Sequence, residues 1–238
     1  MIKKYILKIL LKITTFLNNN RKVKIQPKSP ADFYFEEVAK DSYNQFKDYF
    51  KNSFVFNSDN SIREFAINEA TKIFDNKNLF LEFGVYKGDS INLFANNLKK
   101  IDGEIFGFDS FQGLKDEWIT EEYNSPGTFN LDKKKPKTHT NVNLIEGWVE
   151  DTLNIFLEKN LEKNIAFIHF DMDTYKSTSF VLEKIRHKIK KGTFILFDEF
   201  YGFPNWEKYE FKALKEKLNA NQFKYIAFGN RQACIQII

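Results

Sequence analysis

Short apolar runs alternate with amphipathic stretches from residue 79 to the C-terminus. The apolar runs have the length and composition of strands, and they cover residues 79–84, 104–110, 143–147, 165–171, 193–200, 224–229 and 233–238. Stretches typical of helices lie between them, at 89–100, 150–161, 176–190 and 206–219. This alternation predicts an α/β fold with a mostly parallel, seven-stranded sheet and right-handed crossovers. Only the tetrapeptide GNRQ joins the last two runs, so we expect them to form an antiparallel hairpin.

Two further segments have a different pattern. Residues 36–75 contain apolar positions at helical spacing and neither glycine nor proline, which predicts a helical region before the sheet. Residues 111–141 have no clear apolar period and include SPGT and KKKPK. A loop of that length is typical of a lid over a site or of a disordered segment.

The charge of the chain is divided between two regions. The 238 residues include 36 Lys and Arg and 32 Asp and Glu, a formal net charge of +4. Residues 1–28 contain eight basic residues and no acidic one, so the rest of the chain is mildly acidic. A nucleic-acid-binding function of the main domain is therefore disfavoured. The single cysteine, Cys234, excludes an intramolecular disulfide scaffold and favours a reducing compartment.

Residues 1–17 are rich in Ile and Leu, and Lys4, Lys8 and Lys12 are spaced four residues apart. The lysines interrupt the apolar run, which disfavours a transmembrane span and a signal peptide. On a helix they form one basic stripe opposite an apolar face. Such a segment either binds an anionic membrane surface or packs as a helix on this chain or on a protein partner. We therefore expect a cytoplasmic protein, free or peripheral on the inner face of the membrane.

The end of the first strand has the sequence LEFGVYKGDS, in which Gly84 and Gly88 form G-x-x-x-G. This spacing disfavours a dinucleotide, whose fingerprint is G-x-G-x-x-G. Asp109 ends the second strand, where a carboxylate can accept hydrogen bonds from both hydroxyls of a ribose. A nucleoside cofactor without a diphosphate fits this pair of features, and S-adenosylmethionine is one. The alternative is a glycine turn with an acidic helix cap.

Carboxylates also gather at the ends of two later strands. Asp171 and Asp173 follow the fourth strand, and Asp198 and Glu199 follow the fifth. Neighbouring strand ends lie about 5 Å apart. Ionised carboxylates at that distance repel one another unless they are protonated or neutralised. Oxygen ligands of this kind select Mg²⁺, Ca²⁺ or Mn²⁺. The alternative is that the acids cap the helices that follow, Asp173 being the better capping candidate.

Together these segments resemble class I S-adenosylmethionine-dependent methyltransferases and, more narrowly, the macrocin O-methyltransferase family of metal-dependent sugar O-methyltransferases. The resemblance extends from about residue 79 to the C-terminus. It rests on LEFGVYKGDSI (81–91), GFDSFQGL (107–114), EGWVEDTL (146–153), HFDMDTYKST (169–178) and FDEFYGFPNW (197–206). It implies a single Rossmann-like catalytic domain at 76–238 with 111–141 as lid and acceptor loop. Before that domain come a basic segment and linker (1–30) and a helical extension (31–75).

The resemblance also implies roles for single residues. Glu82 and Gly84 would border the methionine part of the cofactor, and Asp109 its ribose, with Ser110 beside it. Gly147, Trp148 and Val149 would flank the adenine. Asp171, Asp198 and Glu199 fall on the metal positions, although Glu199 stands where a second aspartate is frequent. The segment 115–141 shows no family motif, so the acceptor is the least defined part of the site.

We expect Mg²⁺ to lower the pKa of a sugar hydroxyl, which then attacks the methyl group in line. His139 is the first candidate for a general base, and Asp171 or Asp173 is the second. His169 is a weaker candidate, because it lies on a strand where a core histidine is commoner. Alternative functions are methylation of a catechol-like phenol, a nucleotide-sugar oxidoreductase, and a non-catalytic membrane-associated module. A homo-oligomer is also expected from the resemblance.

Overall fold

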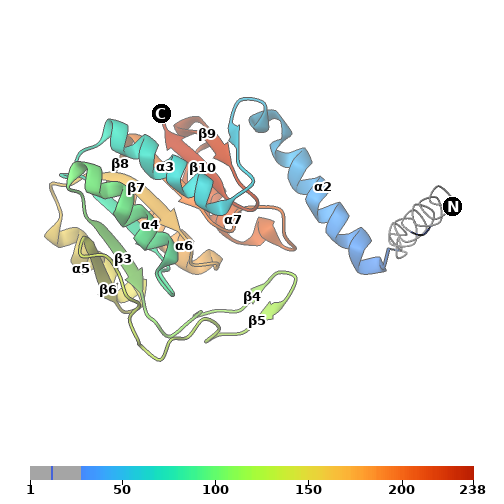
Figure 1. The fold of residues 1–238 in the computed structure, drawn as a ribbon, viewed down its shortest axis with the longest axis horizontal. Coiled ribbons are helices and arrows are strands. Elements are labelled where there is room, and N and C mark those ends of the chain that lie inside the picture. Colours follow the sequence, from blue (N-terminus) through green and yellow to red (C-terminus); the bar gives the residue numbers. More distant parts are fainter. Residues whose placement is uncertain (1–11, 13–27) are drawn as a thin grey trace, which may run out of the picture. The chain divides into compact units, whose positions relative to one another are not determined.

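The computed structural model describes Lys12 and residues 28–238. Its centre is an eight-stranded sheet with the order β1-β9-β10-β8-β7-β2-β3-β6 (Figure 1). The strands are β1 Phe54–Val55, β2 Leu79–Phe83, β3 Ile105–Asp109, β6 Val142–Glu146, β7 Ile165–Phe170, β8 Ile189–Phe197, β9 Phe223–Phe228 and β10 Ala233–Ile237. All neighbours are parallel except β10, which is antiparallel to both β8 and β9. The predicted α/β fold with a C-terminal antiparallel hairpin is therefore confirmed.

Two apolar clusters cover the two faces of the sheet, because neighbouring residues of a strand point to opposite sides. On β2, Leu79, Leu81 and Phe83 join one cluster and Phe80 joins the other. The first cluster includes residues of α5 Val149–Lys159, α6 Tyr175–Ile185 and α7 Glu210–Lys217, and the second includes residues of α3 Asp59–Ile73 and α4 Asp89–Leu98. Helices on both faces leave the strand ends free to form a site.

The predicted helical region at 36–75 is interrupted. It consists of α2 Pro30–Phe50 and α3, separated by the two-residue strand β1. Residues 51–58 contain Asn, Ser, Val and Phe, which favour turns or strands over helix. The Phe56 N–H donates to the Phe228 carbonyl at 2.8 Å, so β1 extends the sheet beyond the seven predicted strands. Sequence periodicity alone did not reveal this break.

Residues 111–141 are ordered as a loop around a small antiparallel ribbon of β4 Trp118–Ile119 and β5 Tyr123–Asn124. The backbone N–H of Ile119 donates to the Tyr209 hydroxyl at 2.8 Å, and Asn205 donates to the Ile119 carbonyl at 3.2 Å. These bonds attach the ribbon to the segment that precedes α7. The structure therefore contradicts the expectation of a disordered segment at 111–141.

The amphipathic segment predicted at residues 1–17 lies outside the described residues, apart from Lys12. Within the described part of the chain, no helix combines the length and the apolarity needed to cross a bilayer.

Candidate active site

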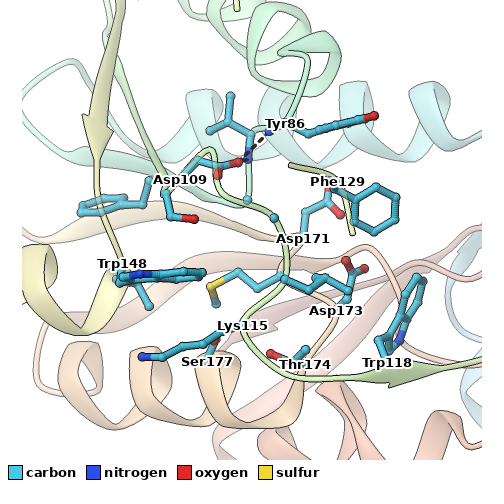
Figure 2. A pocket seen from close by; sticks show the side chains of 18 of the residues that line it. Tyr86, Asp109, Lys115, Trp118, Phe129, Trp148, Asp171, Asp173, Thr174 and Ser177 are labelled. Carbon is cyan, nitrogen blue, oxygen red and sulfur yellow. Dashed lines mark hydrogen bonds between the residues drawn. The ribbon is translucent and has the colours of Figure 1, made fainter. Parts of the chain in front are cut away.

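A cavity of about 250 Å³ lies at the carboxyl ends of the central strands (Figure 2). In an open α/β sheet this edge is where ligands bind. The predicted site residues that line it are Gly84, Asp109, Ser110, Gly147, Trp148, Val149, Asp171, Asp173 and Glu199. The strands thus bring together residues that are more than a hundred positions apart in the sequence.

The glycine turn after β2 is shaped by close contact with β7. Gly84 has φ +88°, and a Cβ atom there would lie 1.8 Å from the carbonyl oxygen of Asp171. Tyr86, two residues on, also has a left-handed backbone, at φ 48°. Such conformations in bulky residues store strain and occur often at functional sites. The turn therefore requires glycine at position 84 for a steric reason.

Asp109 fixes this turn from the end of β3. Its Oδ2 accepts hydrogen bonds from the backbone N–H groups of Val85 and Tyr86, both at 2.8 Å. Its Oδ1 accepts one from the N–H of Phe111 at 2.7 Å. A carboxylate oxygen has two lone pairs, so Oδ1 can still accept one bond from a ligand hydroxyl. Asp109 therefore organises the loop, lines the cavity and keeps one acceptor position without a donor from the described residues.

One end of the cavity offers a flat aromatic face. Gly147, Trp148 and Val149 line it, at the start of α5. The Lys115 ammonium lies 5.4 Å from the centre of the Trp148 ring and 3.2 Å from a carboxylate oxygen of Glu150. An indole ring in this position can stack against a purine base.

The other end has an aromatic wall that the sequence did not predict. Tyr86, Trp118 and Phe129 line it, and Phe129 lies 5.4 Å from Tyr86 and 6.5 Å from Trp118 between ring centres. Figure 2 shows Trp118 and Phe129 near Asp173, away from Trp148. Trp118 and Phe129 come from the 111–141 loop, in which no motif marks them. The loop therefore builds part of the cavity.

A cluster of acidic side chains lies between these two ends. Burial, followed by repulsion from Asp198, raises the pKa of Asp173 to about 7. Burial likewise raises the pKa of Glu199 to about 8, together with the charges of Asp173 and Asp198. The pKa of Asp171 is well above its usual value for the same reasons, burial first and the charge of Asp198 second. The raised pKa values mean that the ionised carboxylates are not fully balanced by neighbouring positive charges.

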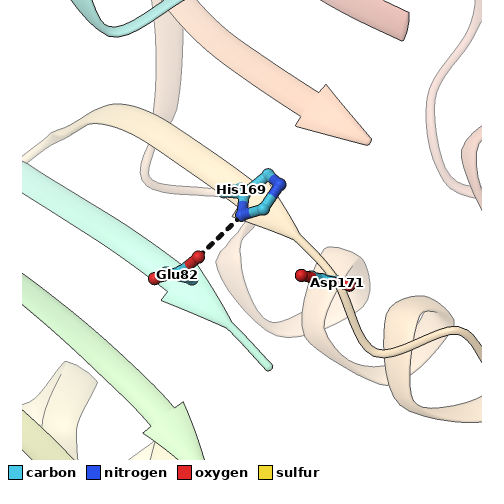
Figure 3. A group of neighbouring side chains, drawn as sticks. All are labelled: Glu82, His169 and Asp171. Carbon is cyan, nitrogen blue, oxygen red and sulfur yellow. Dashed lines mark hydrogen bonds and ion pairs between the residues drawn. The ribbon is translucent and has the colours of Figure 1, made fainter. Parts of the chain in front are cut away.

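Asp198 is surrounded by donors instead. Its Oδ1 accepts from Arg63 at 2.7 Å, from His169 Nε2 at 3.1 Å and from the Gln232 side-chain amide. The other nitrogen of His169, Nδ1, lies 2.9 Å from the buried Glu82 (Figure 3). Burial lowers the pKa of His169, but hydrogen bonds to Asp198 and Glu82 raise it more, to about 9. His169 is thus an imidazolium held between two carboxylates.

The donor set fits a hard divalent cation. Six acidic side chains interact electrostatically in this region (Glu82, Asp171, Asp173, Asp198, Glu199 and Glu210), and three cationic ones lie among them (Arg63, His169 and Arg231). Glu199 Oε2 is buried without a hydrogen-bond partner, 3.5 Å from Arg231. A divalent cation would balance the excess negative charge.

A second grouping of possible ligands suits a cation less well. Atoms of Glu82, His169 and Asp171 lie within 4.8 Å of one another. Both nitrogens of His169 already face carboxylates, so neither has a free lone pair for a metal. By ligand type, the all-oxygen set of Asp171, Asp198 and Glu199 suits a hard cation better, although among the described residues it is not the group whose ligand atoms lie within 4.8 Å of one another.

Three predicted residues lie away from the cavity lining. Glu82 is fully buried beside His169, and neither Glu82 nor Asp198 is among the residues that line the cavity. His139 is exposed and does not line the cavity; its backbone N–H donates to the Asn92 side-chain oxygen at 2.9 Å. The structure therefore does not bring the first candidate for a general base to the site, whereas Asp171 and Asp173 line it.

Comparison with protein families gives a match over residues 81–200 to a model described as a methyltransferase domain. That segment begins in β2 and ends just after Glu199, so it includes the glycine turn, Asp109 and the acidic cluster. A comparison with curated proteins finds no match.

Solved structures with a similar fold include CalS11, a TDP-rhamnose 3′-O-methyltransferase of calicheamicin biosynthesis. It is 21% identical, with a TM-score of 0.56, over 91% of this chain and 99% of that one. The O-methyltransferase NovP is 17% identical, with a TM-score of 0.55, over 75% and 78% of the two chains. An O-methyltransferase from Bacillus cereus in complex with SAH is 14% identical, with a TM-score of 0.50, over 90% and 93%. At these identities the likeness concerns the fold.

Proposed function

The chain belongs to the family of methyltransferase domains, and we propose that it transfers the methyl group of S-adenosylmethionine to a sugar hydroxyl with the help of Mg²⁺. The observation that carries this proposal is the position of the acidic cluster. Asp171, Asp173 and Glu199 line the cavity, and Figure 2 shows Asp171 and Asp173 between Trp148 and the aromatic pair Trp118 and Phe129.

The two ends of the cavity suit the two substrates. We assign the end with Asp109 and Trp148 to the nucleoside of S-adenosylmethionine. This end combines a carboxylate oxygen that can accept a hydrogen bond from a ribose hydroxyl with a flat apolar ring that can stack on a base. The aromatic wall is assigned to the acceptor, because sugar rings pack well on aromatic faces. Two points support a sugar: the fold is shared with CalS11, a TDP-rhamnose 3′-O-methyltransferase, and five segments of the sequence resemble the macrocin O-methyltransferase family.

The residues of the chain contribute positioning and charge. Asp171, Asp198 and Glu199 would hold the cation, which when bound supplies Lewis-acid chemistry that lowers the pKa of a hydroxyl. Asp173 lines the cavity with a pKa near neutrality, so it is placed to accept the hydroxyl proton. Trp118 and Phe129 exclude water on the acceptor side, and the Asp109-bound turn orients the cofactor. In-line attack on the methyl group then depends mainly on orientation.

A methyl-transfer assay with labelled S-adenosylmethionine tests this function. The full-length protein is offered free sugars, nucleotide-linked sugars, lipid-linked glycans and catechols, each with Mg²⁺ or with EDTA. We expect label only in a sugar, with a loss of at least about 100-fold in EDTA and recovery on adding Mg²⁺. EDTA-resistant transfer contradicts the metal. Transfer to catechols alone contradicts the sugar, and no transfer at all favours a non-catalytic module.

We also propose that residues 1–17 bind an anionic membrane surface through their lysines, which would place the enzyme where surface glycans are assembled. Co-sedimentation with anionic vesicles tests this. The full chain is expected to sediment, and a chain lacking residues 1–28 is expected to stay in solution while keeping its activity. Equal sedimentation of the two chains would contradict the proposal.

A further inference from the structure

The Asp198 carboxylate is bound in an unequal way. All the hydrogen bonds that its side chain makes with the described residues go to Oδ1, from Arg63, His169 and Gln232. An sp² oxygen has two lone pairs, so three donors saturate it. Asp198 Oδ2 is therefore the oxygen that is left for a cation.

The donors come from three separate parts of the fold. Arg63 lies on α3, His169 on β7, and Gln232 between β9 and β10. Arg63 and Gln232 are outside residues 81–200, the segment that matches the methyltransferase model. The Arg63 guanidinium also interacts with the charges of Asp171 and Glu82, so its positive charge acts on more than Asp198 alone.

We propose that Arg63 and His169 are positioning residues that fix Asp198 for binding of the cation through Oδ2 alone. This inference rests on the proposed metal-dependent function. Arg63 holds Oδ1 from one side, while His169, fixed in turn by Glu82, holds it from another. Removal of hydrogen bonds that orient a metal ligand in this way typically weakens metal binding by about 10- to 100-fold.

The helix that bears Arg63 does not depend on this arginine for its packing. Ile62, Ala66, Ile67 and Ala70 of α3 are fully buried in the apolar cluster on that face of the sheet. The Arg63 side chain is 16% exposed at the edge of this contact. An R63Q variant is therefore expected to fold, and circular dichroism and thermal unfolding verify this.

Calorimetric titration of MgCl₂ into the full-length protein tests the proposal. A purely electrostatic effect predicts that R63Q binds Mg²⁺ more tightly, because a repelling positive charge is removed. The positioning role predicts the opposite, a Kd raised by about 10-fold or more. R63K keeps the charge but not the planar fork of donors, so its Kd is expected to rise as well.

R186Q is the matched control, because it removes one positive charge from an exposed position on the chain. Its Kd for Mg²⁺ is expected to stay within about twofold of the wild type. An unchanged or lower Kd in folded R63Q overturns the positioning role while leaving the metal site intact. Absence of Mg²⁺ binding by the wild type overturns the metal-dependent function and this inference with it.

Discussion

Gly84 lies where the chain leaving β2 is in close contact with the chain leaving β7. A side chain at this position would meet the Asp171 backbone, which also positions a proposed metal ligand. A change at Gly84 therefore acts on the cofactor turn and on the acidic cluster together.

We expect Gly84→Ala to lower the free energy of unfolding by about 3 kcal/mol and to abolish binding of S-adenosylmethionine. The reason is the 1.8 Å contact, which the backbone can relieve only by moving. Gly127→Ala is the control: Gly127 has φ +89°, but nothing lies within 4 Å of its Cβ position. It should cost only the left-handed strain, about 1 kcal/mol. Urea unfolding and calorimetry measure both quantities, and equal losses in the two variants would contradict the steric argument.

The residues that could be predicted from the sequence are those in local motifs at strand ends. Gly84, Asp109, Trp148 and Asp171 all line the cavity, because a strand followed by a turn fixes where the next few side chains lie. Arg63 and Gln232 could not be predicted, since each reaches Asp198 only through the tertiary packing of α3 and the β9–β10 connection.

Trp118 and Phe129 escaped prediction for a different reason. They lie in a loop without periodicity, where an aromatic residue on its own does not indicate a site. His139 is the opposite case, a residue that was predicted to belong to the site and does not line the cavity. Its residue type suits a base, yet its position before β6 leaves it exposed and outside the cavity lining.

At the scale of elements, the connection between α5 and β7 depends on a buried lysine. Lys188, just before β8, donates to the carbonyls of Asn160 and Leu161 at 2.7 Å and of Lys163 at 3.1 Å. Burial lowers the pKa of its ammonium group. The ammonium group is thus the donor to the carbonyls of Leu161 and Lys163, and it shares the carbonyl of Asn160 with the backbone N–H of Lys163.

Lys188→Met removes these bonds but keeps most of the apolar stem. We expect it to lower the free energy of unfolding by about 2 kcal/mol and to leave the KM for S-adenosylmethionine within about twofold. Lys190→Met is the control, because Lys190 is exposed and donates to one carbonyl, that of His187. It should cost less than about 0.5 kcal/mol. Chemical denaturation of both variants measures the difference, and a similar small loss in each would show that the three bonds add no stability.

At the scale of the whole molecule, the buried charges make stability depend on pH. The pKa values of Asp173 and Glu199 are raised to about 7 and about 8, and that of His169 to about 9. These groups therefore hold more protons in the folded state than in the unfolded chain. The difference extends from about pH 4, near the ordinary pKa of a carboxyl group, to about pH 9, the folded pKa of His169. Without metal, the free energy of unfolding from these groups falls as the pH rises through this range.

A bound cation favours the deprotonated carboxylates, so Mg²⁺ should stabilise the protein more at pH 8 than at pH 5.5. At 100 times its Kd the gain at pH 8 is about 2.7 kcal/mol, or a rise in Tm of about 5 to 10 °C. Thermal unfolding at both pH values, in EDTA and in MgCl₂, measures it. The same rise at both pH values would contradict the assignment of the buried acids.

The position of Arg63 has a consequence for protein engineering. The residues at 76–238 resemble a complete, transplantable enzyme, and a designer would be inclined to graft them onto the N-terminal helices of another methyltransferase. Such a chimera would retain every residue of the recognised segment but lose the arginine that α3 delivers to Asp198. An exchange of segments in this fold would therefore have to keep α3 together with the residues that Arg63 contacts.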